Sequence, residues 1–343
     1  MRVWRKIDNV HIAAACDRNE QIAKETAKAW NIPAHYTDLA EMLQRHSFSI
    51  VDICTPTHTH CKLAIQALES GCHVLLEKPM VMTTNEAEQV MSARKRSGTK
   101  LGVIHNMLFE PVMIKALSLI RKGNLGQIIN ADVRFLHTNE EPMLSNRSHW
   151  CHSLQGGRFG EILPHPIYLL QALLGQIDIE LVSIAKIGDY PWIPADELFV
   201  ALGRNKTSGS IYISFNSPVE AVIVSVYGTK SVFRIDLTGE TIVQLKHRPF
   251  NRLSKGIDNL RQIYQLASST LRATSLILSG KWSNGHETYI RGFVDYVLNE
   301  KDPPVTLQEA YNTVETLERI CKKIDFIVSH GLRECTKFEA VET

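Results

Sequence analysis

The sequence has 343 residues, of which 44% are hydrophobic and 22% are charged, and its formal net charge is +2. This length suits about two domains, and the composition is that of a globular protein with enough apolar material for a core. A charge so close to zero, without a long block of Lys or Arg, excludes an extended basic surface for nucleic acid. No run of about 18 apolar residues predicts a membrane span, and the N-terminus lacks the apolar stretch of a signal peptide. We therefore expect a cytoplasmic protein with neither a membrane nor a nucleic-acid partner.

The seven cysteines form no Cys-x-x-Cys pair, and several lie within apolar strand patterns. That usage predicts reduced, buried thiols rather than a disulfide framework or a zinc site. His58 and His60 are two residues apart, but no third ligand follows with the spacing of a metal site, so no bound metal is expected.

The first 124 residues alternate between short apolar runs and amphipathic runs. Strand patterns occupy 10–16, 49–54, 72–76 and 100–106, and a further short strand opens the segment 34–43. Helical patterns occupy 20–30, 61–71, 85–98 and 110–126. Asn19 is a suitable N-cap for the first helix, Gly71 and Gly98 close two others, and Pro111 lies in the first turn of the last. This alternation predicts a doubly wound parallel sheet.

After about residue 126 the pattern changes to β-rich, period-two runs separated by turn signals. These runs lie at 127–138, 179–190, 196–204, 208–215, 220–229, 231–238 and 240–246, and a helical segment at 160–175 interrupts them. They predict a second, α+β domain with one large, mostly antiparallel open sheet. We expect the domains at 1–124 and 125–332, a helical insertion at 250–283 in the second, and a flexible tail at 333–343.

The helical insertion carries apolar residues on one stripe: Ile257, Leu260, Ile263, Tyr264, Ala267 and Leu271. Such a stripe is typical of a helix that packs against the sheet or a neighbouring subunit, which is the interpretation we favour. Because basic residues flank it, a helix lying on a membrane surface is the alternative.

Polar residues follow two neighbouring strand patterns of the first domain. Thr55-Pro56 comes after the run 49–54, and Glu77-Lys78-Pro79 comes after the run 72–76. A strand, a helix and a strand of this length form a parallel crossover, and ligands bind beyond the carboxyl ends of such strands. We therefore expect both segments to face the same crevice.

A second polar group follows the glycines Gly156 and Gly157. Glu161 and His165 are four residues apart, so they share one face of a helix. A carboxylate beside an imidazole orients the ring for acid/base chemistry, while the glycines allow a close approach of the backbone to a ligand. An ordinary exposed pair on a surface helix is the alternative interpretation.

Together these segments resemble the glucose-fructose oxidoreductase / inositol dehydrogenase / MocA (Gfo/Idh/MocA) family. The stretch TPTHTHCKLAIQALESGCHVLLEKP is similar to the family's TP-x-x-x-H and AL-x-x-G-x-H-V-x-x-EKP segments. The later segment is similar to the family's G-G-x-x-x-D-x-x-x-H, with Glu161 at the aspartate position. The resemblance covers nearly the whole chain. It implies a Rossmann-type domain, an open-sheet domain and an NAD(P)-dependent oxidoreductase acting on a carbinol of a sugar, cyclitol or nucleotide-sugar.

The resemblance also implies residue roles. Lys78 and His165 would be the catalytic acid/base pair, and Glu161 would orient His165 or bind a substrate hydroxyl. The implied cofactor-binding residues are Asp17, Arg18, Thr55, Pro56, His60, Glu77, Lys78 and Pro79, and the substrate contacts are His105, Asn106, Trp150 and Gly157. Asp17 favours NAD through the ribose diol, whereas Arg18 could accept the 2′-phosphate of NADP. A cis peptide bond before Pro79 and a homodimer or homotetramer formed through the antiparallel sheet are implied as well.

The chain departs from the family's pattern at its start. A dinucleotide-binding sheet opens with a strand and a G-x-G-x-x-G turn, about 20 residues before the acidic residue. Only sixteen residues precede Asp17, and none is glycine. Because the first strand lies centrally in the order 3-2-1-4-5-6, we expect two unpaired strand edges within the sheet. A start codon set too late, a decayed gene copy and N-terminal residues that fill the gap in a new way are the three open explanations.

Three functions therefore remain open. The first is the dehydrogenase, and the second is a non-catalytic sugar-binding or assembly relative that has lost dinucleotide binding. The third is an enzyme of the same fold that eliminates or hydrolyses with a tightly held NAD.

Overall fold

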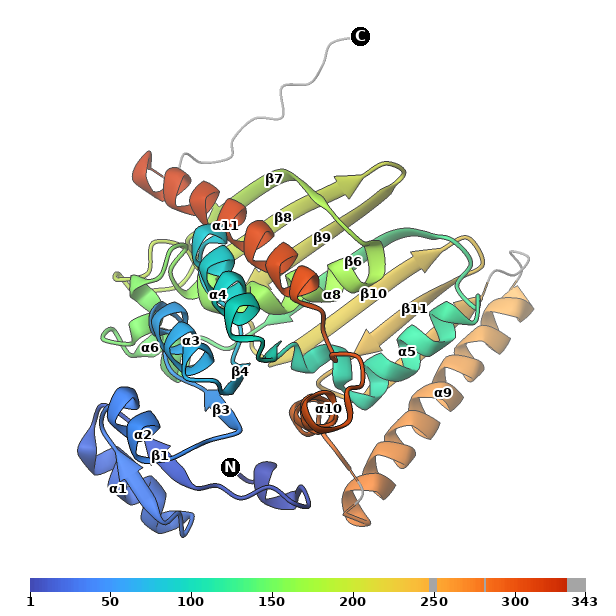
Figure 1. The fold of residues 1–343 in the computed structure, drawn as a ribbon. Coiled ribbons are helices and arrows are strands. Elements are labelled where there is room, and N and C mark those ends of the chain that lie inside the picture. The colour runs from blue at the N-terminus through green and yellow to red at the C-terminus, as the bar shows by residue number, and fades with distance from the viewer. Residues whose placement is uncertain (247–251, 281, 332–343) are drawn as a thin grey trace. The chain divides into compact units, whose positions relative to one another are not determined.

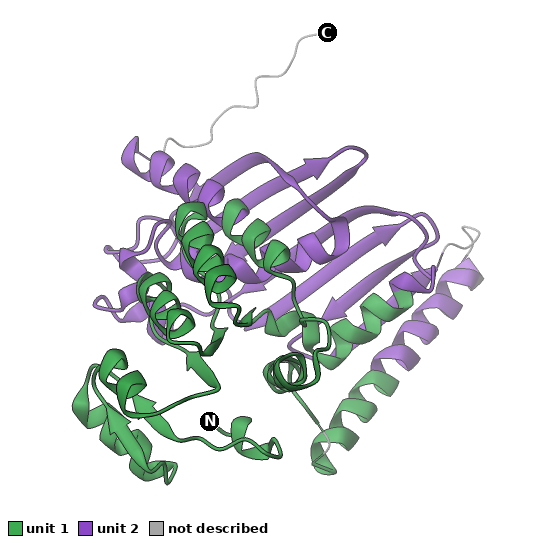
Figure 2. Ribbon diagram, in the orientation of Figure 1, with its two compact units in different colours: residues 1–119, 267–315 green, residues 120–266, 316–343 purple. Residues whose placement is uncertain are grey.

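The computed structural model describes residues 1–246, 252–280 and 282–331, and the tail predicted at 333–343 lies outside them. Contacts divide the chain into two compact units (Figure 2). Unit 1 comprises Met1–Leu119 and Ala267–Glu315, and unit 2 comprises Ile120–Leu266 and Thr316–Thr343. The first division falls after Leu119, and the late segment Ala267–Glu315 belongs to unit 1. The domain boundaries at 124 and 332 stay a prediction.

Unit 1 alternates short strands with helices, as the sequence predicts. Its elements are η1 Trp4–Lys6, β1 Ala14–Cys16, α1 Glu20–Ala29, β2 Ala34–Tyr36, α2 Leu39–Arg45, β3 Ile50–Ile53, η2 Thr57–Thr59, α3 His60–Glu69, β4 His73–Leu76, α4 Thr84–Ser97, β5 Leu101–Val103, η3 Asn106–Phe109, α5 Pro111–Arg121 and α10 Gly285–Asn299 (Figure 1). The Asn19 side chain caps α1 by accepting from the backbone of Gln21 and Ile22. Gly98 ends α4 with φ +68°, in the left-handed region that favours glycine. Both predicted helix ends are confirmed.

The parallel sheet of unit 1 is divided in two. β1 pairs with β2, while β3, β4 and β5 form a separate sheet in that order. All of these pairings are parallel. Within the described chain, β1 and β3 therefore each have one edge that no strand covers, which confirms the expected pair of unpaired edges.

Residues 1–13 supply apolar contacts near these edges without forming a strand. Trp4 is buried and packs in one cluster with Leu75 of β4 and with Tyr289 and Phe293 of α10. Its Nε1 donates to Asp52 Oδ2 of β3 over 2.7 Å. β1 is shorter than the predicted strand at 10–16 because only its last three residues pair with β2.

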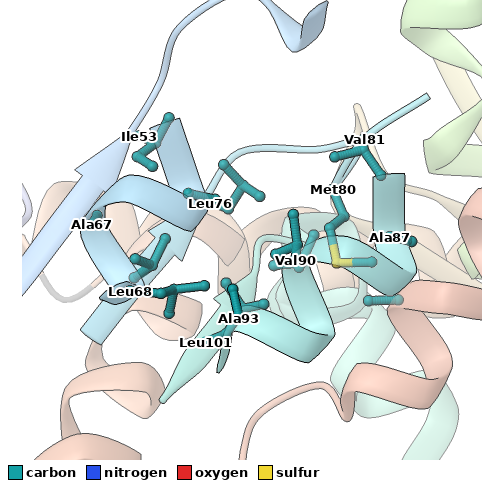
Figure 3. Close-up of a cluster of buried hydrophobic side chains, with 14 of the residues drawn as sticks. Ile53, Ala67, Leu68, Leu76, Met80, Val81, Ala87, Val90, Ala93 and Leu101 are labelled. Atoms are coloured by element: carbon teal, nitrogen blue, oxygen red, sulfur yellow. The ribbon is translucent and has the colours of Figure 1, made fainter. Parts of the chain in front are cut away.

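Unit 1 has a second core, between α3, α4 and the sheet of β3–β5 (Figure 3). The helices present small residues here, including Ala67 and Ala87, which allow close packing against Leu76 and Leu101. α11 (Leu307–Ser329) adds Ala310 and Val314 to the same cluster. This core fixes the carboxyl ends of β3 and β4, from which the predicted site residues follow.

Unit 2 contains the large sheet that the sequence predicts. Its strands are β6 Ile128–Leu136, β7 Asp178–Ala185, β8 Glu197–Arg204, β9 Thr207–Ser214, β10 Ala221–Gly228, β11 Ser231–Asp236 and β12 Thr241–Lys246, in the order β12-β11-β10-β6-β9-β8-β7. All neighbours are antiparallel except β6 and β9, which are parallel. The helical elements are α6 Pro142–Ser145, η4 Trp150–Ser153, α7 Arg158–Ile162 and α8 Pro164–Leu174, and α9 Arg252–Leu278 begins in unit 2.

One face of this sheet is covered and the other is open. Ala131, Val133 and Phe135 of β6 are completely buried, and α8 packs on β6 and β9. The alternate residues are more exposed: Arg134 of β6 and Phe199 of β8 lie on the other face. None of the helices in the described part of the chain is both long and apolar enough to cross a bilayer.

Candidate functional site

The two signature loops of unit 1 are joined by one buried histidine. His60 Nδ1 lies 3.0 Å from the carbonyl oxygen of Pro79, and Nε2 lies 2.7 Å from that of Thr55. The ring is 1% exposed. Burial lowers the pKa of His60, although hydrogen bonds to these carbonyls oppose the shift. The predicted segments after β3 and β4 therefore lie together, as expected, with His60 as the link between them.

The turn after β3 is fixed by hydroxyl groups. The Thr59 hydroxyl donates to the carbonyl oxygen of Pro56 over 2.8 Å, and Thr55 Oγ1 lies 2.6 Å from Thr59 Oγ1. Because Thr59 uses its hydrogen on Pro56, the Thr55 hydroxyl donates to Thr59. This pattern holds Thr55 and Pro56 in one conformation at the strand end.

The turn after β4 contains the expected cis peptide bond between Lys78 and Pro79. The Glu77 carboxylate accepts from the backbone N–H of Lys78 over 3.2 Å and lies 3.4 Å from His286 Nε2. Burial acts to raise the pKa of Glu77, but the hydrogen bond and charge of His286, together with Lys78, lower it below its usual range. Glu77 is thus a carboxylate at the strand end, and the half-buried Lys78 follows it.

The residues after β5 are buried. His105 is 2% exposed and Asn106 is 8% exposed. Burial lowers the pKa of His105 to about 3, so the ring is neutral at physiological pH. Gly285 opens α10 against this segment, since a Cβ there would lie 2.0 Å from the carbonyl oxygen of Asn106. Substrate contact by either residue stays a prediction.

Asp17 follows β1, where the acidic residue of a dinucleotide site is expected. Its backbone N–H donates to the Tyr36 carbonyl over 3.1 Å, and its Oδ1 accepts from the Asn19 backbone over 2.8 Å. Asp17 is half-buried and Arg18 is exposed. Unit 1 therefore fits a dinucleotide in part: Asp17 suits a ribose diol and the loops after β3 and β4 suit the nicotinamide end, but residues 1–16 offer no glycine turn for the pyrophosphate.

In unit 2, the predicted acid and histidine are buried rather than on an exposed helix face. Glu161 lies on α7 and is 8% exposed, and His165 lies on α8 and is 7% exposed. His165 Nδ1 is 2.7 Å from the hydroxyl of Tyr168, and its ring stacks on Phe135 with centroids 6.0 Å apart. The interpretation as an ordinary surface pair is therefore wrong, whereas a direct role of Glu161 in orienting His165 stays a prediction.

Arg158 is the buried partner of Glu161, and sequence reasoning passed over it. Its Nη1 donates to Glu161 Oε2 over 2.5 Å, and its Nη2 and Nε donate to the two carboxylate oxygens of Glu141 over 2.6 and 3.3 Å. The guanidinium also lies over the ring of Phe215 at 5.0 Å. The three-residue spacing of Arg158 and Glu161 could have signalled the first pair, but Glu141 is 17 residues away in sequence.

The glycines before α7 have different surroundings. A Cβ on Gly156 would lie 2.7 Å from Cys321 Sγ of α11, so this glycine permits close helix packing, where we expected a ligand. Gly157 has nothing within 4 Å of the corresponding position and remains available for the predicted substrate contact. Trp150 is half-buried on η4, with its ring 5.3 Å from that of His149.

Unit 1 is of the Rossmann type, with an acidic residue after one strand and an EKP turn after another, and unit 2 contains an open sheet. Together these features define a class of two-domain nucleotide-linked oxidoreductases. Two family models match the chain. The first, an oxidoreductase family with an NAD-binding Rossmann fold, covers residues 1–105. The second, the C-terminal alpha/beta domain of that family, covers residues 118–325. The chain belongs to the Gfo/Idh/MocA oxidoreductase family, which confirms the resemblance.

Similar proteins support this assignment. Oxidoreductase P35 of Formosa agariphila is 29% identical over 50% of this chain and 55% of its own length. Levoglucosan dehydrogenase of Pseudarthrobacter phenanthrenivorans is 27% identical over 52% of this chain and 45% of its own. The match thus spans about half the length of these curated relatives. The WlbA dehydrogenase from Bordetella pertussis, solved with NADH and UDP-GlcNAcA, has the same fold, with a TM-score of 0.77, 19% identity and coverage of 93% of this chain and 89% of that one.

Proposed function

We propose that the protein is an NAD-dependent oxidoreductase acting on a carbinol carbon of a sugar, cyclitol or nucleotide-sugar. The observation that carries the proposal is the burial of Glu161 and His165 in unit 2, with Glu161 paired to Arg158. Burying ionisable groups costs free energy that packing alone does not recover, so such a set is typical of a site that handles charge and protons. The ligands named for the relatives, levoglucosan and UDP-GlcNAcA, support the substrate class.

In this proposal Lys78 and His165 hold the reacting hydroxyl and exchange its proton. The Tyr168 hydroxyl fixes the orientation of the His165 ring. Glu161, held by Arg158, orients His165 or accepts a hydrogen bond from a substrate hydroxyl. When bound, NAD supplies the acceptor for the hydride that leaves the carbinol carbon, while the hydroxyl proton passes to the base.

A non-catalytic sugar-binding or assembly protein is the second candidate. The divided sheet of unit 1 favours it, because within the described chain β1 and β2 form a sheet separate from that of β3, β4 and β5. The retained Lys78, Glu161 and His165 argue against it, since apolar residues would pack at lower cost in the two buried positions.

The test is a fluorescence titration of the purified protein with NADH and NADPH, followed by turnover assays with sugars, cyclitols and nucleotide-sugars. His165→Asn is expected to keep NADH binding and to lose about 100-fold or more in turnover, as is typical for loss of an acid/base group. His152→Asn, on the neighbouring η4, is the matched control and is expected to keep both. If the folded protein binds neither nucleotide, also when extended upstream in its reading frame, the dehydrogenase is refuted and the non-catalytic function takes its place.

We further propose a homodimer or homotetramer that pairs through the open face of the unit 2 sheet. Phe199 of β8 and Leu181 of β7 are 40% and 51% exposed there. Phe199→Arg is expected to shift the mass measured by sedimentation towards the monomer. The cysteines in the described part of the chain are free thiols, which supports a reducing compartment such as the cytoplasm.

A further inference from the structure

The helix α9 has its polar and apolar sides reversed relative to an ordinary surface helix. Six of its apolar residues are between 38% and 82% exposed: Ile257, Leu260, Ile263, Tyr264, Leu271 and Leu278. We call these residues the apolar stripe. A surface helix normally buries such a stripe and exposes its polar side, and contiguous exposed apolar surface marks an interaction site.

From Ser254 to Ser269, the less exposed side of α9 is polar. The Gln265 side chain pairs with the backbone of Gln244, accepting from its N–H over 2.8 Å and donating to its carbonyl over 3.2 Å. Ser269 is 8% exposed, although it carries no apolar bulk. These polar contacts fix which side of the helix faces outwards, so the exposure of the apolar stripe follows from the way α9 is attached.

The apolar surface is wide. At about 100° per residue the apolar stripe covers roughly 120° of the helix circumference, and the exposed Leu266 and Ile277 widen it to about 180°. A two-helix seam needs only a narrow row of apolar positions. An apolar surface covering half the circumference matches a flat partner better than a single helix.

The charges on α9 also select the partner. Arg252, Lys255, Arg261 and Arg272 against the single acid Asp258 give the helix a charge of +3 (four basic residues minus one acidic residue). By the same helical spacing, Arg261 and Arg272 lie beyond one edge of the apolar surface, Lys255 borders the other edge, and Arg252 lies just inside that second edge. A second copy of the chain would bring two such positive helices together, whereas an anionic surface is complementary to them.

A further basic residue lies close to this border. Burial and the nearby charge of Arg272 lower the pKa of Lys115, which projects from α5. Lys115 thus adds a further basic residue in the neighbourhood of Arg272.

We propose that α9 docks the protein on an anionic lipid surface, with the apolar stripe entering the boundary between headgroups and acyl chains and the basic residues contacting the headgroups. α9 is not apolar enough to span a bilayer, so it lies on the surface. This surface shares no residue with the site proposed for the reaction, and the proposal differs from the expectation that the protein has no membrane partner.

The test is co-sedimentation of the whole protein with phosphatidylcholine vesicles, with and without phosphatidylglycerol, at low and high salt. We expect binding only to vesicles that contain phosphatidylglycerol, and weaker binding at high salt. Leu260→Gln with Leu271→Gln is expected to weaken binding about tenfold or more, and Arg261→Gln about fivefold. Because these side chains are exposed, the variants should fold and keep the same unfolding temperature. Ile187→Gln and Leu298→Gln, equally exposed but outside α9, are the matched controls and should bind like the original protein.

Absence of binding to the anionic vesicles, or equal binding by the variant with both leucines replaced, overturns the proposal. A protein that binds no vesicles but forms a larger species in sedimentation, which the same variant loses, would show that the stripe joins two copies instead. NADH titration of these variants separates this result from the proposed function, since neither outcome depends on nucleotide binding.

Discussion

Replacing Arg158 with Met should destabilise unit 2 by several kcal/mol. The guanidinium is 3% exposed and bridges Glu141 and Glu161, whose side chains are 17% and 11% exposed. Methionine keeps much of the side-chain volume over Phe215 but leaves two poorly solvated carboxylates without their shared cation. Removing one partner from a buried ionic group typically costs about 3–5 kcal/mol, and that is the loss we expect in the free energy of unfolding at neutral pH.

The measurement must report on unit 2 itself, because a chain with two compact units need not unfold in one step. Native-state hydrogen exchange of the α8 amides gives the free energy of opening at this place. Arg204→Met is the control, because Arg204 also lies in unit 2 and pairs with Asp178 over 4.0 Å, with the two side chains 44% and 62% exposed. Such a surface pair contributes about 1 kcal/mol or less. If Arg158→Met cost no more than the control, the three charges would not act as a buried unit and our account of Glu161 would be refuted.

The remaining predictions concern three other positions. At pH values between about 3, the pKa of His105 in the folded protein, and its usual 6.5, His105 binds a proton only in the unfolded chain. The free energy of unfolding should therefore fall with decreasing pH by about 1.4 kcal/mol per pH unit. Urea titrations across this pH range should show that the free energy of unfolding depends less on pH in His105→Gln. An equal pH dependence in the variant and the original protein would contradict this. Gly156→Ala should lower the free energy of unfolding by about 3 kcal/mol, because Gly156 has a positive φ and a Cβ there would meet Cys321. Gly98→Ala, which has a positive φ but open space around it, should lower it by about 1 kcal/mol in the same thermal unfolding assay. Trp4→Phe removes the hydrogen bond to Asp52 and should lower stability by about 1 kcal/mol, and an unchanged midpoint would show that this bond does not hold the N-terminal turn.

Local signals in the sequence were sufficient to predict the helix ends and the type of sheet in each unit. Asn19 and Gly98 have the residue types and positions that a cap requires, and their effect depends only on neighbours within one turn. The antiparallel sheet likewise follows from alternation along each strand. The link through His60 could not be predicted in this way, because its two carbonyl partners belong to loops that only the folded sheet brings together.

α9 shows a different limit of sequence reasoning. Periodicity identified the stripe that contains Leu260 and Leu271, but periodicity cannot state which side of a helix meets the protein. The structure exposes both leucines and uses Gln265 for attachment, so packing of the stripe against the sheet is wrong, while packing against a neighbouring subunit stays a prediction. The choice depends on polar partners on β12, which have no signature in the helix itself.

In the divided sheet of unit 1, an uncovered strand edge affects apolar side chains and backbone polar groups differently. Apolar surface needs only contact, so Trp4 and its neighbours can cover part of β3 from a 3-10 turn. Backbone N–H and C=O groups need partners at defined positions, which a turn cannot supply along a strand. β4 has ladder partners on both sides, whereas β1 and β3 have them on one side only. β1, β2, β3 and β5 are all edge strands within the described chain. Asp17 and Thr55 follow two of them, so the positions of these two residues depend on how firmly the edges of β1 and β3 are held.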